Sequence, residues 1–84
     1  MHSQDIIYDT VYIEVIFLIS YAPFYKTLKK KGITTYYLIY KQGVPPNTIQ
    51  RMKHGKHIST RTIDLLCSIL NCEISDLVEY KKDE

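Results

Sequence analysis

The pattern of hydrophobic and polar residues changes near the end of the first quarter of the chain. Over Ile6–Tyr21 the sequence is dense in Val, Ile, Tyr and Phe and partly alternates, as half-buried β-strands do. Further along, apolar residues recur at helical spacing, and Phe24 and Leu28 are the first such pair. The pattern predicts a β-rich extension over residues 1–19 and a helical domain over residues 20–84.

Glycines and prolines mark the expected ends of the helices. A residue after the last helical turn often needs a left-handed backbone, which glycine adopts at least cost, so Gly32, Gly43 and Gly55 predict three helix ends. Proline suits the first helical turn, because its missing N–H would have no partner there. The five predicted helices are Pro23–Lys31, Thr35–Lys41, Pro46–His54, Thr60–Asn71 and Ser75–Glu79.

The helices carry residues suited to a common core, and two of them follow a capping residue. Thr34 and Ser59 have side-chain oxygens that accept N–H groups at a helix start. The expected core positions are Phe24, Leu28, Leu38, Ile39, Val44, Ile49, Met52, Ile63, Leu66, Cys67 and Leu70. The expected fold is therefore all-α, with five helices around one core and an N-terminal β-strand extension.

Charge is distributed unevenly along the chain. The balance of 11 basic and 9 acidic residues hides a segment, Val15–Ile63, that contains nine Lys or Arg residues and no Asp or Glu. The nine are Lys26, Lys29, Lys30, Lys31, Lys41, Arg51, Lys53, Lys56 and Arg61. Such a basic segment between acidic ends favours a polyanionic partner such as nucleic acid, with an ordinary solvated face as the alternative.

The two helices on either side of Gly43 have the layout of a helix-turn-helix motif, over about residues 35–54. The segments GITTYYLIYKQGVPPNTIQRMKHGKHIS and RTIDLLCSILNCEISDLVEY resemble the Cro and lambda-repressor type of helix-turn-helix domain, as found in small XRE-like bacterial regulators. The resemblance covers about Ile19–Tyr80. It implies a compact five-helix lambda-repressor-like fold and a transcriptional regulator that binds sequence-specific sites in double-stranded DNA.

The resemblance also implies which residues meet DNA. The third helix would lie in the major groove, where Pro46, Asn47 and Arg51 occupy positions that usually face bases. Asparagine can pair with adenine and arginine with guanine, whereas Pro46 offers only an apolar contact. The implied phosphate-contacting residues are Thr35, Thr48, Lys53, Lys56 and His57. Two departures from the family pattern are the Pro45–Pro46 pair, which removes N–H donors, and Ile39, which replaces a small residue between the two helices.

Catalysis and metal binding are not expected of this sequence. A chain of 84 residues has room for one small core, and no Ser-His-Asp set, paired carboxylate or phosphate-cradling loop is present. The spacing of His54, His57, Cys67 and Cys72 does not match a zinc finger, so no metal or other cofactor is expected. The two cysteines are five residues apart and should point to different sides of one helix, which suits a reducing cytoplasm.

The N-terminal segment is expected neither to cross a membrane nor to direct secretion. Its longest run without a charge, Val15–Tyr25, has 11 residues, and a bilayer span needs about 20. Three interpretations of its strands stay open. They could form a hairpin on the domain that reaches residues 78–81, pair with a second copy to support a homodimer, or have no set structure.

Two alternatives to sequence-specific duplex binding stay open as well. The chain could be an antitoxin or another protein-interaction module, holding a basic partner through the N-terminal strands or the acidic C-terminus. It could also bind single strands by stacking bases on Tyr36, Tyr37 and Tyr40. Steep weakening of binding by salt would favour DNA over a protein partner, and sensitivity to tyrosine substitutions would favour single strands.

Overall fold

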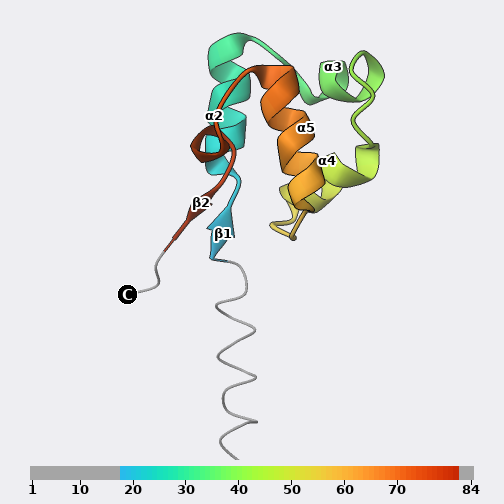
Figure 1. Ribbon diagram of the computed structural model, residues 1–84. Helices are drawn as coiled ribbons and strands as arrows, with labels where there is room; N and C mark the ends of the chain where they lie inside the picture. The colour runs from blue at the N-terminus through green and yellow to red at the C-terminus, as the bar shows by residue number, and fades with distance from the viewer. Residues whose placement is uncertain (1–17, 82–84) are drawn as a thin grey trace, which may run out of the picture.

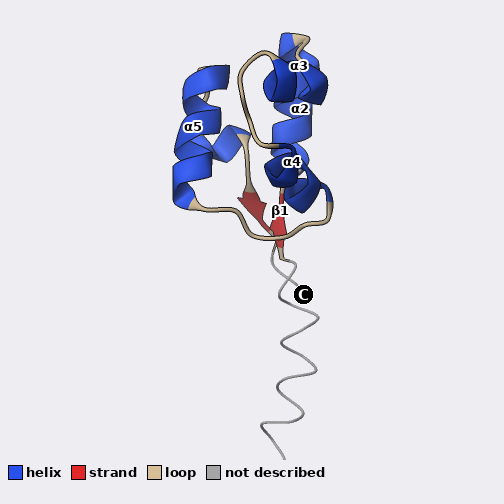
Figure 2. Ribbon diagram, turned by 90° about the vertical axis from the view of Figure 1, so that its right-hand side faces the viewer, coloured by secondary structure: helices blue, strands red, loops and turns tan. Residues whose placement is uncertain are grey.

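Four α-helices and one pair of very short strands make up the part of the protein that the computed structural model describes, residues 18–81. The elements are β1 (Ile19–Ser20), α2 (Ala22–Lys31), α3 (Thr35–Tyr40), α4 (Pro46–Lys53), α5 (Thr60–Leu70), the 3₁₀ helix η1 (Ile74–Asp76) and β2 (Glu79–Tyr80). Figures 1 and 2 show the strand pair at one end of the helical array, the lower end in both views. The four α-helices begin and end within one residue of their predicted bounds.

A single cluster of buried residues joins all the helices. Its members are Tyr21, Phe24, Leu28, Leu38, Val44, Met52, Leu66, Leu70 and Leu77. Phe24, Leu38, Leu66 and Leu77 are 0% exposed, and they come from α2, α3, α5 and the segment after η1. Four predicted core residues, Ile39, Ile49, Ile63 and Cys67, are only half-buried. The helices therefore share one core, as predicted, although its edge is less covered than expected.

The segment after α5 does not form the predicted fifth α-helix. Residues Ile74–Asp76 form a single 3₁₀ turn, and Glu79–Tyr80 continue as β2. The turn is held by a capping box in which Glu73 and Asp76 exchange hydrogen bonds between side chains and backbone N–H groups. Beyond it, the chain extends because Glu79 and Tyr80 pair with β1. Within residues 18–81 the fold thus has four α-helices, not five.

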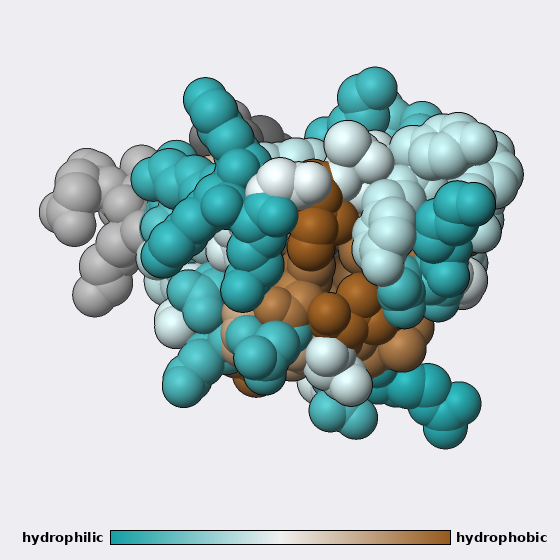
Figure 3. Space-filling view, turned by 90° about the horizontal axis from the view of Figure 1, so that it is seen from above, coloured by the Kyte–Doolittle hydropathy of each residue, from teal (hydrophilic) through white to brown (hydrophobic). Residues whose placement is uncertain are grey.

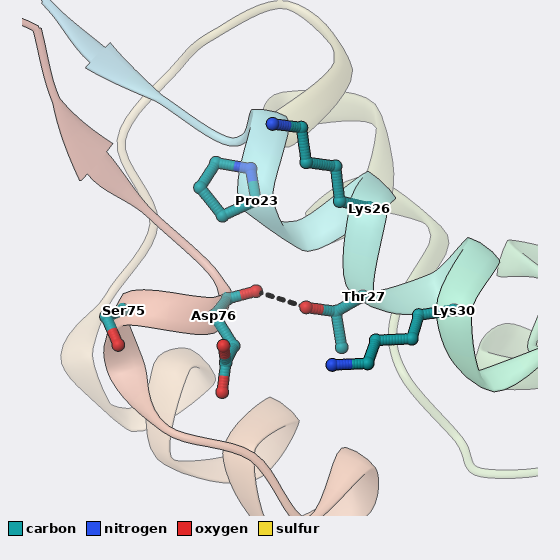
Figure 4. A pocket seen from close by; sticks show the side chains of 6 residues that line it. All are labelled: Pro23, Lys26, Thr27, Lys30, Ser75 and Asp76. Carbon is teal, nitrogen blue, oxygen red and sulfur yellow. Dashed lines mark hydrogen bonds between the residues drawn. The ribbon is translucent and has the colours of Figure 1, made fainter.

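Hydrogen bonds fasten this C-terminal segment to α2. The Thr27 hydroxyl donates to the carbonyl oxygen of Asp76 at 2.8 Å, and the Phe24 N–H donates to the carbonyl oxygen of Leu77 at 3.2 Å. Figure 4 shows the first of these bonds at the side of an open hollow of about 290 Å³. Lys26 and Lys30 line the same hollow, so part of the basic charge of α2 lies beside η1.

The strand pair joins the two ends of the described chain. Ile19 pairs with Tyr80 and Ser20 with Glu79 in antiparallel register, and the Lys81 N–H donates to the carbonyl oxygen of Leu18 at 2.8 Å. For these residues the interpretation in which the N-terminal strand reaches residues 78–81 is confirmed. The remainder of the predicted β-rich extension, residues 1–17, lies outside the described residues.

The two cysteines are closer together than predicted. Asn71 ends α5 in the left-handed conformation, with φ at 51°, and this turns the chain back on the helix. The Cys72 N–H consequently donates to the carbonyl oxygen of Cys67 at 3.1 Å, and both cysteines pack against the same buried cluster. Burial raises the pKa of the Cys72 thiol. The prediction that the cysteines point to different sides was wrong, because it assumed that the helix continued through Asn71.

A patch of apolar surface remains exposed at the end of the domain opposite the strand pair. In Figure 3 this end is seen from above, and apolar side chains reach the surface between hydrophilic ones. A domain of this size cannot cover its core completely. Among residues 18–81, no helix has both the length and the hydropathy needed to cross a membrane.

Candidate nucleic-acid interface

Helices α3 and α4 form a helix-turn-helix unit whose start and turn are both fixed by local contacts. The Thr34 hydroxyl accepts the Tyr37 N–H at 3.0 Å and caps α3, as predicted. In the turn, the Val44 N–H donates to the carbonyl oxygen of Leu38 at 2.9 Å. Leu38 is 0% exposed and Val44 is 1% exposed, so the turn is anchored in the core.

The turn between these helices depends on Gly43, whose φ is +76°. A Cβ atom added there would meet no other atom within 4 Å, so the strain of a substitution would come from the backbone alone. We expect Gly43→Ala to lower the free energy of unfolding by about 1 to 2 kcal/mol, measured by urea denaturation. Gly43→Asn should cost less, because asparagine tolerates the left-handed region. Equal stability of Gly43→Ala and the wild type would contradict this account of the turn.

Helix α4 presents a polar, cationic face to solvent and an apolar face to the core. Pro46, Asn47 and Arg51 are exposed, as predicted for residues that face bases. Thr48 is only 8% exposed, so the expectation that this predicted phosphate-contacting residue is exposed was wrong. The physical reason is helical spacing, since Thr48 lies one turn before Met52, which is 2% exposed.

Arg51 is held in place by the loop that follows α4. Its Nε–H donates to the carbonyl oxygen of His57 at 2.9 Å, and its own carbonyl oxygen accepts the Lys56 N–H at 2.8 Å. A guanidinium has five N–H donors, so this contact leaves four on the two terminal nitrogens. A bidentate contact to guanine O6 and N7 needs two donors, and two of these four can supply them.

The exposed face of α4 includes two residues that are not among the predicted DNA-contacting residues. Gln50 and His54 are exposed, and their side-chain Nε2 atoms lie 3.0 Å apart, within hydrogen-bond distance. Gln50 is one turn beyond Asn47, and His54 is one turn beyond Gln50, so the helical period alone could have identified both as candidates for DNA contact. Both carry groups that can donate or accept hydrogen bonds to DNA.

The predicted phosphate-contacting residues fall into two groups in the structure. Thr35 and Lys53 line one open depression of about 500 Å³ together with Tyr25, Ile49 and Gln50. This depression lies between α2, α3 and α4. Lys56 and His57 are exposed in the loop between α4 and α5. Their backbone groups make the hydrogen bonds to Arg51 that are described above. Thr35 therefore lies beside α4, and Lys56 and His57 follow α4 in the chain.

The basic residues of the domain are divided between α4 with its following loop and other parts of the surface. Lys53, Lys56 and Arg51 lie on α4 and its following loop, whereas Lys26 and Lys30 lie beside η1. No acidic residue occurs between positions 18 and 63. The acids of the described chain are Asp64, Glu73, Asp76 and Glu79. The Lys, Arg, Asp and Glu residues of α4 and its following loop are therefore all basic, and they are three of the nine basic residues counted in the sequence.

Three tyrosines of α3 lie at the surface, as predicted. Tyr36 and Tyr40 are 64% and 66% exposed, and their ring centroids are 4.6 Å apart with the planes tilted by 39°. The Tyr37 hydroxyl accepts a hydrogen bond from the Gln42 amide at 2.8 Å. The rings of Tyr36 and Tyr40 contact each other, and this contact reduces the ring area that they offer to stacked bases.

Metal-ligating side chains do not gather at the α4 face or elsewhere within residues 18–81. Those residues contain no group of three or more His, Cys, Asp or Glu side chains that could hold an ion. His54, His57, Cys67 and Cys72 are divided between the α4 end of the domain and the α5 C-terminus. The chemistry that the face offers is hydrogen bonding and positive charge.

A capped helix, a buried turn and a second helix with an exposed polar face define a helix-turn-helix DNA-binding domain. The chain belongs to the Cro/C1-type helix-turn-helix DNA-binding domain family, whose profile matches residues 25–83. Its fold is similar to the crystal structure of transcriptional regulator VanUg, Form II, with a TM-score of 0.70 and 23% sequence identity. The match covers 77% of this chain and 87% of the VanUg chain. No curated protein is similar enough to this chain to count as a match.

Proposed function

We propose that this protein is a transcriptional regulator that binds specific sites in duplex DNA and reads the major groove with α4. The observation that carries the proposal is the exposed pair of Asn47 and Arg51, one helical turn apart on a face with no acidic neighbour in sequence between residues 18 and 63. Asparagine and arginine can distinguish adenine and guanine in the major groove. Pro46 would contribute an apolar contact at the helix start.

The proposal includes contacts to the DNA backbone on both sides of α4. Thr35 at the start of α3, and Lys53, Lys56 and His57 at the end of α4 and in its loop, would bind phosphates. Their positions at the rim of the exposed face support this role. Such contacts fix the register of a protein on DNA without reading sequence. Thr48 is excluded from this set because it is buried.

The proposed regulator acts in the cytoplasm as a binding protein without catalysis, and as a homodimer on a two-part site. Two-fold dimers suit DNA sites with two related halves, which supports the dimer. Sedimentation of the free protein and of its complex with the selected duplex would give the number of copies. One copy per complex would remove the dimer from the proposal.

Selection of bound duplexes from a random pool tests the proposed function. We expect the wild-type protein to enrich one motif, because a face with two base-reading side chains discriminates among sequences. A pool without enrichment, combined with capture of a basic protein partner by the same chain, would replace the proposal with a protein-interaction module.

The salt dependence of binding tests the phosphate contacts. We expect Lys56→Ala to weaken binding to specific and unrelated duplexes alike and to reduce the slope of log K against log salt by about 0.9. One released counterion per lost contact is the physical reason. Lys26→Ala removes the same charge beside η1 and should leave the slope unchanged. A slope for Lys56→Ala equal to the wild-type slope would show that Lys56 touches no phosphate.

A further inference from the structure

The loop between α4 and α5 is tied to the strand end of the domain by a buried tyrosine. Tyr21 lies between β1 and α2 and is 5% exposed. Its hydroxyl donates to the carbonyl oxygen of Lys56 at 2.7 Å, across 35 positions of sequence. Tyr21 also lines an apolar hollow of about 290 Å³ together with His57 and Ile58 of the loop. The hydroxyl thus contacts the loop that holds Arg51, and Tyr21 and this loop border the same hollow.

Three hydrogen bonds link Tyr21, the loop of Lys56 and His57, and the backbone and side chain of Arg51. The Tyr21 hydroxyl donates to the carbonyl oxygen of Lys56, the Lys56 N–H donates to the carbonyl oxygen of Arg51, and the Arg51 Nε–H donates to the carbonyl oxygen of His57. Burial raises the pKa of Tyr21, while the charge of Arg51 and the backbone of Ile58 oppose that rise. The hydroxyl therefore remains a donor at neutral pH, close to the guanidinium.

A fixed guanidinium reads a base more selectively than a free one. An exposed arginine loses rotamer freedom when it binds, and this loss reduces the free energy left for discrimination. Arg51 has its Nε already bound to His57, so its terminal nitrogens are oriented before DNA arrives. The orientation depends on the position of the His57 carbonyl, and Tyr21 holds the neighbouring carbonyl of the same loop.

We propose that Tyr21 is a positioning residue for DNA recognition, which fixes the loop of Lys56 and His57 and through it the guanidinium of Arg51. The proposal rests on the proposed function, because it assigns to Tyr21 a part in the base preference of α4. It predicts that the Tyr21 hydroxyl affects discrimination at the base that Arg51 reads and leaves the other positions of the site unchanged.

The test compares Tyr21→Phe with the wild type on the duplex that the wild type selects. Tyr21→Phe keeps the buried ring and removes only the hydroxyl donor. We expect base preference to fall about three- to tenfold at the position that Arg51→Ala relaxes, with preference elsewhere unchanged. In the Arg51→Ala background, Tyr21→Phe should have no further effect on that position. Tyr80→Phe, at a tyrosine that is 64% exposed, is the matched control and should leave preference unchanged.

A second measurement needs no DNA. Nuclear magnetic resonance of the free protein should show that the Arg51 Nε–H is protected from solvent exchange in the wild type. In Tyr21→Phe this protection should fall about three- to tenfold, as the base preference does. An unfolding midpoint for Tyr21→Phe within a few degrees of the wild-type value would show that loss of the fold is not the cause.

The outcomes separate this inference from the proposed function. If the wild type selects a motif and Tyr21→Phe has the same preference and the same Nε–H protection, the positioning role is overturned and the regulator stands. If the wild type selects no motif, both are overturned. A uniform loss at every position would also count against positioning, because it would show a structural role only.

Discussion

Replacing Phe24 with alanine is expected to lower the free energy of unfolding by about 3 to 5 kcal/mol. Phe24 is 0% exposed, and its cluster includes residues from every α-helix of the described chain. Truncation removes a large apolar side chain and leaves a cavity that the rigid surroundings fill only in part. A domain of this size has about 5 to 15 kcal/mol in total, so the loss is a large share of it. Urea denaturation followed by circular dichroism would measure it.

The control for Phe24→Ala is Tyr40→Ala, which removes an aromatic ring that is 66% exposed on α3. Exposed positions away from caps and turns usually change stability by less than about 0.5 kcal/mol, and the loss of the contact with Tyr36 adds little to this. Both variants should unfold in one transition, because a single cluster joins the helices. Similar destabilisation by the two substitutions would contradict the placement of the core at Phe24.

The helix boundaries could be predicted because local chemistry determines them. Gly32, Gly43 and Gly55 all have positive φ, between 68° and 76°, as their positions after helical runs indicated. Thr34 and Ser59 cap α3 and α5 with their hydroxyl groups, also as predicted. Each of these signals acts within one helical turn, so no knowledge of the tertiary structure is needed to find it.

The C-terminal segment was mispredicted because distant contacts decide its conformation. A helix over Ser75–Glu79 is compatible with the local sequence. The structure instead buries Leu77, uses its carbonyl to accept the Phe24 N–H, and pairs Glu79 with Ser20. These partners lie more than 50 positions away, and together they outweigh the small helix propensity of a short segment.

The candidate site shows the same division between local and distant causes. Helical spacing from Asn47 and Arg51 correctly predicted which side of α4 faces solvent, apart from Thr48. The contact from Arg51 to His57 could not be predicted, because it depends on the path of the loop after Gly55. The contact from Tyr21 to Lys56 depends on how the strand end of the domain meets that loop. Sequence thus identifies the exposed side chains of α4, and the tertiary structure determines how the Arg51 side chain is oriented.

The double substitution Asn47→Ala/Arg51→Ala is expected to remove most of the sequence preference of the protein. Each bidentate contact to a base contributes about 1 to 3 kcal/mol of discrimination, which is a factor of about 5 to 150. The two side chains lie one turn apart on the exposed face of α4, so their effects should add to about 2 to 6 kcal/mol, less any coupling between them. Competition between the selected duplex and an unrelated duplex of equal length, at one fixed salt concentration, would measure the ratio.

The fold and the backbone contacts should survive this substitution, because both side chains are exposed and neither belongs to the buried cluster. Affinity for the unrelated duplex should therefore fall only by the effect of the one positive charge removed with Arg51. Lys26→Ala supplies that charge loss beside η1, away from α4, and should leave the ratio of affinities at its wild-type value. If the double variant also keeps the wild-type ratio, α4 is not the reading helix. A ratio that falls in the double variant alone identifies Asn47 and Arg51 as the residues that read the site, because the charge loss is then excluded as the cause.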